Sequence, residues 1–257
     1  MRRRLRQEWR ALLLAIGLLT RVPIPAIGSC DSRTVGLSLH WYPVAGLLIA
    51  LPLVAVAALT QSSPPLAAAL VLCAWVALTG ALHLDGLADC ADAWVGGMGD
   101  RERTLAIMRD PASGPVAVTA LVLLLLLKWT ALTVIIAAPL DTGWWLIPVL
   151  ARLAVVLAFI STPYVRPGGM GDGLGEQRSP CAIAVVGAAS ALAALLLTPA
   201  RIGGLWLVAA SLLFWCWRRA MRRRLGGFTG DGAGALVELL EAALLVVTAL
   251  AAGGVAS

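Results

Sequence analysis

Charged residues are scarce in this chain. Asp, Glu, Lys and Arg make up 13% of its 257 residues, whereas hydrophobic residues make up 60%. An ordinary soluble domain has about 25% charged residues, so this composition excludes a soluble fold. Because the apolar residues recur in long runs separated by short polar loops, the sequence predicts an all-α integral membrane protein.

Paired cysteines and a cleavage signal are also lacking. The five cysteines lie far apart without a Cys-x-x-Cys pair, which suggests neither a zinc site nor a disulfide framework. Near the N-terminus a basic stretch precedes an apolar run at residues 11–19, and Arg21, Pro23 and Pro25 follow instead of a small-x-small cleavage site. This run is too short to cross a bilayer, so we expect an uncleaved interfacial or re-entrant helix.

Seven apolar segments are long enough, or nearly so, to cross a membrane. They cover residues 37–59, 66–83, 115–138, 143–162, 180–198, 202–217 and 233–253. Segment 202–217 is short, but it carries Trp206, Trp215 and Trp217, and aromatic residues at the ends of a span are typical interface anchors. We therefore expect one polytopic membrane domain over residues 1–257, with about seven transmembrane helices and the N-terminal helix.

The basic residues are distributed unevenly between the two sides. With a cytoplasmic N-terminus, the inner segments are residues 1–36, 84–114, 163–179 and 218–232, and they hold 17 of the 20 Lys and Arg residues. This satisfies the positive-inside rule, so topology explains the net charge of +6 and no nucleic acid partner is needed. Every loop Asp or Glu except Asp141 lies in the same segments, which indicates a site there for a metal and an anionic substrate.

Three carboxylates follow the second apolar segment at helical spacing. Asp85, Asp89 and Asp92 stand at positions i, i+4 and i+7, and a helix would place them on one face. Like charges on one face repel each other unless a cation lies between them, and Mg2+ typically takes one or two carboxylates plus substrate phosphates. The alternative is a solvated acidic helix end whose carboxylates pair with arginines.

Three glycine-rich turns end in aspartate. They are residues 96–100, 168–172 and 226–231, all within the predicted inner segments. Such turns present backbone N–H groups to phosphate oxygens, while the aspartate reaches a metal or caps the next helix. For any single turn, ordinary turn and cap chemistry is the better explanation; the three together favour a shared phosphate site.

Arginines near these turns are candidates for binding phosphate. Residues 100–111 predict a short helix capped by Asp100 and ended before Pro111, with Arg109 placed to meet a phosphate or a lipid headgroup. Arg166 stands at the inner end of a span beside a proline and two glycines, and is a second candidate.

Four charged residues fall within the predicted spans. Lys128, Arg152, Glu238 and Glu241 are costly in a membrane unless they are paired or face a polar cavity. A pair between either glutamate and Arg152 or Lys128 is at least as well supported as a substrate role. A membrane transporter with a path along these residues is a further alternative.

Several separated motifs together resemble the cobalamin synthases, also called adenosylcobinamide-GDP ribazoletransferases. The motifs are Leu-Leu-Thr-Arg-Val-Pro-Ile-Pro at 18–25, the aspartate segment at 83–92, residues 101–110, Tyr-Val-Arg-Pro at 164–167 and Gly-Gly-Phe-Thr-Gly-Asp at 226–231. They cover the chain nearly end to end. The sequence departs from the family pattern at Cys90, at Trp94 and at residues 111–115, which spares the carboxylates.

The resemblance implies a reaction, its cofactor and its location. Adenosylcobinamide-GDP would be joined to α-ribazole or its 5′-phosphate, with release of GMP, by a Mg2+-dependent phosphoryl transfer in the bacterial inner membrane with the active face cytoplasmic. Whether the protein forms a homo-oligomer is left open. The implied metal ligands are Asp85, Asp89, Asp92 and Asp231, with Asp89, Asp92 and Asp231 catalytic, Asp231 being a ligand or the base. The implied substrate-binding residues are Arg21, Arg109, Arg166, Gly227, Thr229 and Gly230.

A CDP-alcohol phosphotransferase would use similar chemistry, but its motif fails here. That family has Ala-Arg after an Asp-Gly pair, whereas Asp85-Gly86 is followed by Leu87, Ala88 and Asp89. The concentration of charge in the inner loops, rather than at the membrane midplane, favours an enzyme over a transporter.

Overall fold

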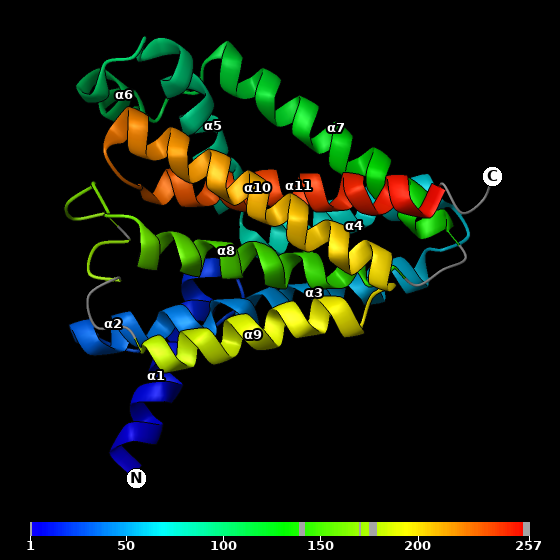
Figure 1. The fold of residues 1–257 in the computed structure, drawn as a ribbon, viewed down its shortest axis with the longest axis horizontal. Helices are drawn as coiled ribbons and strands as arrows, with labels where there is room; N and C mark the ends of the chain where they lie inside the picture. Colours follow the sequence, from blue (N-terminus) through cyan, green and yellow to red (C-terminus); the bar gives the residue numbers. More distant parts are fainter. Residues whose placement is uncertain (1, 139–141, 170, 175–178, 254–257) are drawn as a thin grey trace.

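The computed structural model describes residues 2–138, 142–169, 171–174 and 179–253. Within these ranges the regular structure is helical, which confirms the predicted all-α membrane class. Most of the long helices run along one direction of the molecule, and α5 turns away from it (Figure 1). The one extended pairing among the described residues is a single parallel bridge between Tyr164 and Phe228.

The helices follow the predicted apolar segments closely. Five of the apolar helices have proline in their first turn, where the missing N–H is not needed. In chain order the helices are α1 (Arg2–Leu19), α2 (Ser32–Ser38), η1 (Leu39–Trp41), α3 (Tyr42–Leu59), α4 (Pro64–Thr79), α5 (Leu82–Gly96), α6 (Arg101–Ile107), α7 (Pro115–Ala137), η2 (Trp144–Leu146), α8 (Ile147–Ser161), α9 (Pro180–Leu196), α10 (Ala200–Leu225) and α11 (Gly230–Gly253).

The predicted count of seven crossings is not confirmed. By length and composition, five helical stretches among the described residues qualify as spans, or up to six if α4 and α5 form one bent span. Helix α4 turns by 88° into α5, and α9 has only 17 residues, so two of the seven predicted crossings fall short. In contrast, the short predicted segment 202–217 belongs to the 26-residue helix α10.

The bend between α4 and α5 sets the direction of α5, the aspartate helix, which carries Asp85, Asp89 and Asp92. Gly80 and Ala81 both adopt left-handed backbone conformations, with φ of 61° and 58°, and so end α4. The backbone N–H of Arg21 donates to the carbonyl of Leu78 at 2.7 Å, and the Arg21 side chain lies directly over Gly80. A Cβ atom at Gly80 would stand 2.7 Å from Cγ of Arg21, so the close approach requires glycine there.

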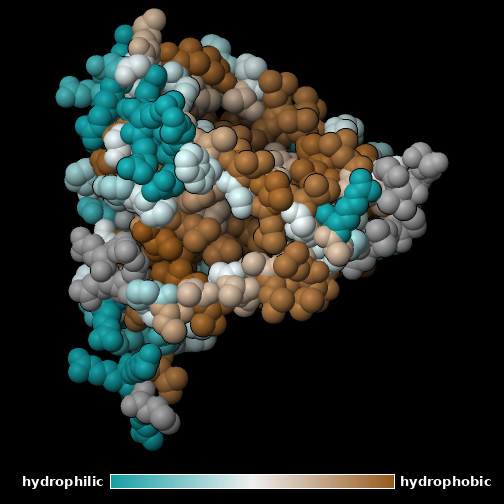
Figure 2. Space-filling model, in the orientation of Figure 1, coloured by the Kyte–Doolittle hydropathy of each residue, from teal (hydrophilic) through white to brown (hydrophobic). Residues whose placement is uncertain are grey.

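The surface separates into a polar end and an apolar body. Hydrophilic residues gather at the end that carries α6 and the α8–α9 and α10–α11 connections, and hydrophobic residues cover the middle (Figure 2). Large apolar side chains on α7 and α10 are exposed, including Leu127 at 53% and Leu212 at 63%. An apolar surface of this extent suits contact with lipid. Helix α1 exposes Leu5 and Trp9 and buries Ala11 and Ala15, which suits the expected interfacial helix.

The charged residues inside the bundle pair with each other. Nζ of Lys128 lies 2.6 Å from Oε2 of Glu238 and 2.7 Å from Oε2 of Glu241. Arg152 forms an ion pair with the other carboxylate oxygen of Glu241, and its Nη2 lies 3.4 Å from Nδ1 of His83. The predicted pairing is confirmed, and the two cations and two anions balance. We call this set of five side chains the buried charge cluster.

Removing one charge from the cluster should destabilise the protein strongly. We expect Lys128→Met to lower the free energy of unfolding by about 3–5 kcal/mol, because it leaves excess negative charge buried. Thermal unfolding in detergent, followed by tryptophan fluorescence, measures the effect.

Two variants make this test specific. The double variant Lys128→Met/Glu238→Gln leaves Arg152 and Glu241 balanced and should recover most of the lost stability. Arg201→Met removes an exposed cation and should change little. Equal unfolding midpoints for Lys128→Met and Arg201→Met would contradict the role of the cluster.

Candidate active site

Three of the predicted carboxylates meet at the polar end of the bundle. Asp85 and Asp89, one helical turn apart on α5, and Asp231, in the first turn of α11, line one open cavity of about 1310 Å³, its mouth included. The other described residues of its lining are Met108, Arg109, Asp110, Pro111, Tyr164, Arg166, Pro167, Gly168, Gly169 and Gly230. Two predicted arginines and one predicted glycine therefore share the cavity with the carboxylates.

Glycines at the crossing of α5 and α11 bring the carboxylates together. A Cβ atom at Gly86 would stand 2.8 Å from the carbonyl oxygen of Asp231 and 3.0 Å from its Cα atom. One turn further along α11, a Cβ atom at Gly234 would stand 3.2 Å from Cα of His83. Contacts this short exclude larger residues, so the two backbones pack directly against each other between Asp85 and Asp231.

The loop before α11 fixes where that helix begins. Thr229 is fully buried and accepts a hydrogen bond from the N–H of Gly232 at 3.0 Å, which caps the helix. Gly227 packs against the carbonyl of Pro163, and the N–H of Phe228 donates to that carbonyl at 2.7 Å. The structure therefore places Gly227 and Thr229 in the framework behind the cavity, and of the three predicted residues in this loop only Gly230 lines it.

Arg166 is held beside the carboxylates by an ion pair. Its Nη1 atom donates to Oδ2 of Asp231 at 2.6 Å, and both side chains are partly exposed, at 28% and 15%. Tyr164 lies in the same wall, where burial raises the pKa of its hydroxyl above the ordinary value and keeps it protonated near neutral pH. Arg109 is exposed and lines the same cavity, next to Asp110. A phosphate in the cavity would therefore have two guanidinium groups within its walls.

Asp92 lies on the same helix but outside this cavity. Its two carboxylate oxygens accept hydrogen bonds from the N–H groups of Gly114 and Ala117, the latter at 2.9 Å. These are N–H groups of the first turn of α7, which lacks a capping side chain of its own. The structure therefore places Asp92 at the start of α7 as a cap, apart from the other three carboxylates; its expected role as a metal ligand and catalytic group stays a prediction.

Arg21 is also placed away from the carboxylates. It lies over the α4–α5 bend and lines neither the open cavity nor the apolar cavity described below; it borders a separate surface pocket formed by residues 14–27. Its expected role in substrate binding stays a prediction. In the first glycine turn, Asp100 caps α6 by accepting from the N–H of Arg103 at 2.7 Å. Of the second turn, Gly168 and Gly169 line the cavity, and Met170 lies outside the described residues.

The open cavity carries an excess of negative charge. Among the described lining residues, four are aspartates and two are arginines. No three His, Cys, Asp or Glu side chains in the described part of the chain converge as a metal-binding group. Mg2+ does not require such a group, because it keeps waters and uses one or two carboxylates plus substrate phosphates. Asp85 and Asp89, which are adjacent on one helix face and open to the cavity, fit that need.

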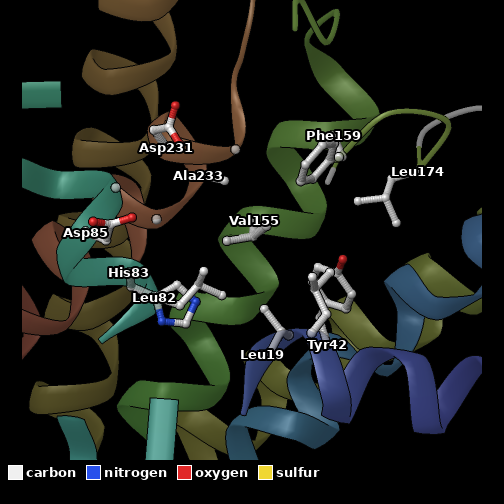
Figure 3. A pocket seen from close by; sticks show the side chains of 15 residues that line it. Leu19, Tyr42, Leu82, His83, Asp85, Val155, Phe159, Leu174, Asp231 and Ala233 are labelled. Atoms are coloured by element: carbon white, nitrogen blue, oxygen red, sulfur yellow. The ribbon is translucent and has the colours of Figure 1, made fainter. Parts of the chain in front are cut away.

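A second, apolar cavity of about 590 Å³, its mouth included, lies deeper in the bundle. It shares Asp85, Gly230 and Asp231 with the open cavity, so the two meet at the carboxylates. Figure 3 shows Asp85 and Asp231 at one side of this space, with Tyr42 and Leu19 across from them. The site therefore has a charged part at the polar end of the bundle and an apolar part deeper in the bundle.

Sequence reasoning missed three features of this site. Asp110 is a wall residue although its sequence context suggests only a helix end, and Tyr164 was visible only as part of a motif. The apolar cavity draws its wall from α1, α3, α5, α8 and α11, and no local pattern indicates that these helices meet.

Comparison with known proteins agrees with this arrangement. The family model described as cobalamin-5-phosphate synthase matches residues 11–249. The chain belongs to the cobalamin-5-phosphate synthase family. A protein of Pseudomonas putida strain GB-1 named adenosylcobinamide-GDP ribazoletransferase is 50% identical over 240 residues, covering 93% of this chain and 98% of the relative.

Two further relatives carry the same name. The protein of Pseudomonas entomophila strain L48 is 51% identical over 92% of this chain and 97% of its own length. That of Pseudomonas aeruginosa strain UCBPP-PA14 is 47% identical over 96% of this chain and 100% of its own length. No solved structure matches the chain significantly. The cavity described above is therefore the candidate active site of a cobalamin-5-phosphate synthase family member.

The cap role of Asp92 predicts a difference between two substitutions. Asp92→Ala should lower the free energy of unfolding by about 1 kcal/mol, because two N–H groups of α7 lose their acceptor. Asp92→Asn keeps a carbonyl acceptor and should lose less stability. Thermal midpoints in detergent measure both, and a larger loss for Asn than for Ala would contradict the cap.

The helix crossing predicts that Gly86 tolerates no side chain. Gly86→Ala should lower the free energy of unfolding by about 1–3 kcal/mol, because the new methyl group would overlap the backbone of Asp231. The matched control is Gly204→Ala, another helical glycine, with open space where its Cβ would stand; it should be neutral or stabilising. Equal effects of the two substitutions, measured by thermal unfolding, would argue against the close crossing.

Proposed function

We propose that this protein joins adenosylcobinamide-GDP to α-ribazole, or to its 5′-phosphate, and releases GMP. The observation that carries the proposal is the convergence of Asp85, Asp89 and Asp231 with Arg109 and Arg166 on one cavity. The relatives named for this reaction align over nearly the whole chain. Carboxylates and guanidiniums in one cavity suit phosphoryl transfer, in which positioning and electrostatics supply most of the catalysis.

In the proposed mechanism a hydroxyl group of the acceptor attacks the phosphorus atom attached to cobinamide. The bond from that phosphorus to the bridging oxygen breaks, and GMP leaves with the electron pair. Arg166 and Arg109 hold phosphate oxygens and stabilise the developing charge. Asp231 is placed to accept the proton of the hydroxyl, because one of its oxygens is held by Arg166 and the other is not.

We propose Mg2+ as the cofactor, with Asp85 and Asp89 as its protein ligands. The metal would supply charge neutralisation on the diphosphate. The negative balance of the lining supports this assignment, since a diphosphate would otherwise enter a cavity with four aspartates and only two arginines among its described residues.

The proposed location is the bacterial inner membrane, with the active face cytoplasmic. Support comes from the arginines, which gather at the polar end where the cavity opens, as positive-inside topology requires. Lys128, Arg152 and both glutamates are committed to the buried charge cluster and line neither cavity, so a transport path along them receives no support.

The test is GMP release by detergent-purified protein supplied with adenosylcobinamide-GDP. We expect release to require both α-ribazole and Mg2+. Asp89→Asn should raise the Mg2+ concentration for half-maximal rate by roughly tenfold or more, because a ligand is lost.

Glu102→Gln is the matched control, since it removes an exposed carboxylate on α6 that lies outside the cavity. It should leave the Mg2+ dependence unchanged. The metal assignment fails if Asp89→Asn behaves like Glu102→Gln. The whole proposal fails if folded wild-type protein releases no GMP with all three components present.

A further inference from the structure

The apolar cavity below the carboxylates contains one polar atom that its surroundings do not explain. Tyr42 lines the cavity with 1% of its surface exposed, and its hydroxyl has no hydrogen-bond partner among the described residues. Ser38, one turn earlier, is the polar side chain beside this hydroxyl, but no hydrogen bond joins the two, and the Ser38 hydroxyl donates to the carbonyl of Val35 instead. Figure 3 shows the tyrosine oxygen pointing into the space between Val155 and Leu174.

An unpartnered buried hydroxyl is expensive, because it has lost its hydrogen bonds to water. A phenylalanine at this position would fill the same volume without that cost. Away from His83, Asp85 and Asp231, this hydroxyl is the one polar side-chain group in the described wall. That is the pattern of a ligand site, in which apolar surface binds a ring and one polar group fixes its orientation.

The walls indicate a flat, apolar ring rather than a polar base. The apolar part of the wall is formed by the side chains of Leu19, Val155, Phe159 and Leu174. Val155 and Phe159 lie on consecutive turns of α8. At this end of the cavity, away from His83, Asp85 and Asp231, a guanine would leave several donors and acceptors without partners, which costs affinity. A bicyclic ring with a single bare nitrogen, that is, one without a hydrogen or substituent, offers one hydrogen-bond acceptor. One hydroxyl donor is enough to satisfy it.

We infer that this cavity holds the benzimidazole base of the acceptor nucleoside, with the Tyr42 hydroxyl donating to the bare ring nitrogen. The inference rests on the proposed function, since α-ribazole is a nucleoside with such a base. It also orients the acceptor: with the base in the apolar cavity, the sugar lies where the two cavities meet, beside Asp85 and Asp231. The attacking hydroxyl then faces the proposed base.

Benzimidazole and indole test this inference directly, because they differ by the one bare ring nitrogen. Their binding to the full-length protein in detergent is measured by ligand-observed NMR titration. We expect wild-type protein to bind benzimidazole roughly fivefold more tightly than indole, the value of one net hydrogen bond. Tyr42→Phe should bind indole as wild type does and lose the preference.

A second variant locates the binding. Val155→Trp should fill the cavity and weaken both probes by tenfold or more, whereas Val208→Trp, at an exposed position on α10, should weaken neither. Tyr42→Phe should unfold at or above the wild-type temperature, because it removes an unpartnered hydroxyl. The inference is overturned if Tyr42→Phe keeps the preference, or if Val155→Trp binds both probes normally. Equal binding of the two probes by wild type, with displacement by a fatty acid, would show a lipid cavity instead and also overturn it.

Turnover separates this inference from the proposed function. In the GMP-release assay, Tyr42→Phe should raise the KM for α-ribazole roughly fivefold and leave the KM for adenosylcobinamide-GDP unchanged. An unchanged KM for α-ribazole would overturn the inference while the proposed function stood. If wild-type protein released no GMP, the proposed function would fail, and the probe titrations would still decide what the cavity binds.

Discussion

The buried charge cluster is the constraint on which the rest of the structure depends. Hydrocarbon offers no water to solvate a charge, so Lys128, Arg152, Glu238 and Glu241 have to meet, and their ion pairs constrain the relative placement of α7, α8 and α11. The cluster therefore fixes the rotation and height of α11. Asp231 stands seven residues before Glu238 on that helix, two turns away on the same face, so its position follows from the cluster.

The same cluster reaches the aspartate helix through a histidine. Arginine only donates hydrogen bonds, so the contact between Arg152 and Nδ1 of His83 makes that nitrogen an acceptor and leaves the ring proton on Nε2. His83 precedes Asp85 by two residues, and the Gly86–Gly234 crossing then sets how deep α5 packs on α11. Charge pairing and close glycine packing thus determine the positions of the carboxylates. Neither involves contact with the reacting atoms of the proposed substrates.

The sequence predicts those features that depend on local pattern. Apolar runs located the helices, and the i, i+4, i+7 spacing correctly placed three aspartates on one helix. Long-range features were missed for a common physical reason. Asp92 caps α7 only because the start of α7 lies beside it in space, and Arg21 supports a bend whose second residue is an alanine in a left-handed conformation. The residues around Asp92 do not indicate that α7 begins beside it, and the residues around Ala81 do not indicate its left-handed conformation.

The predicted count of crossings was not confirmed for a related reason. Hydropathy cannot distinguish an apolar helix that spans the membrane from one that turns sharply at its end, and α4 turns by 88° after 16 residues. This turn has a functional consequence under the proposed mechanism. A straight continuation of α4 would carry Asp85 and Asp89 onward along the bundle, whereas the turn directs them across it to α11. The reaction then takes place at the boundary between the apolar body and the polar end, where an apolar base and a charged diphosphate each find a matching surface. A site wholly in water would not bury the base, and one wholly in the membrane would not accept the diphosphate.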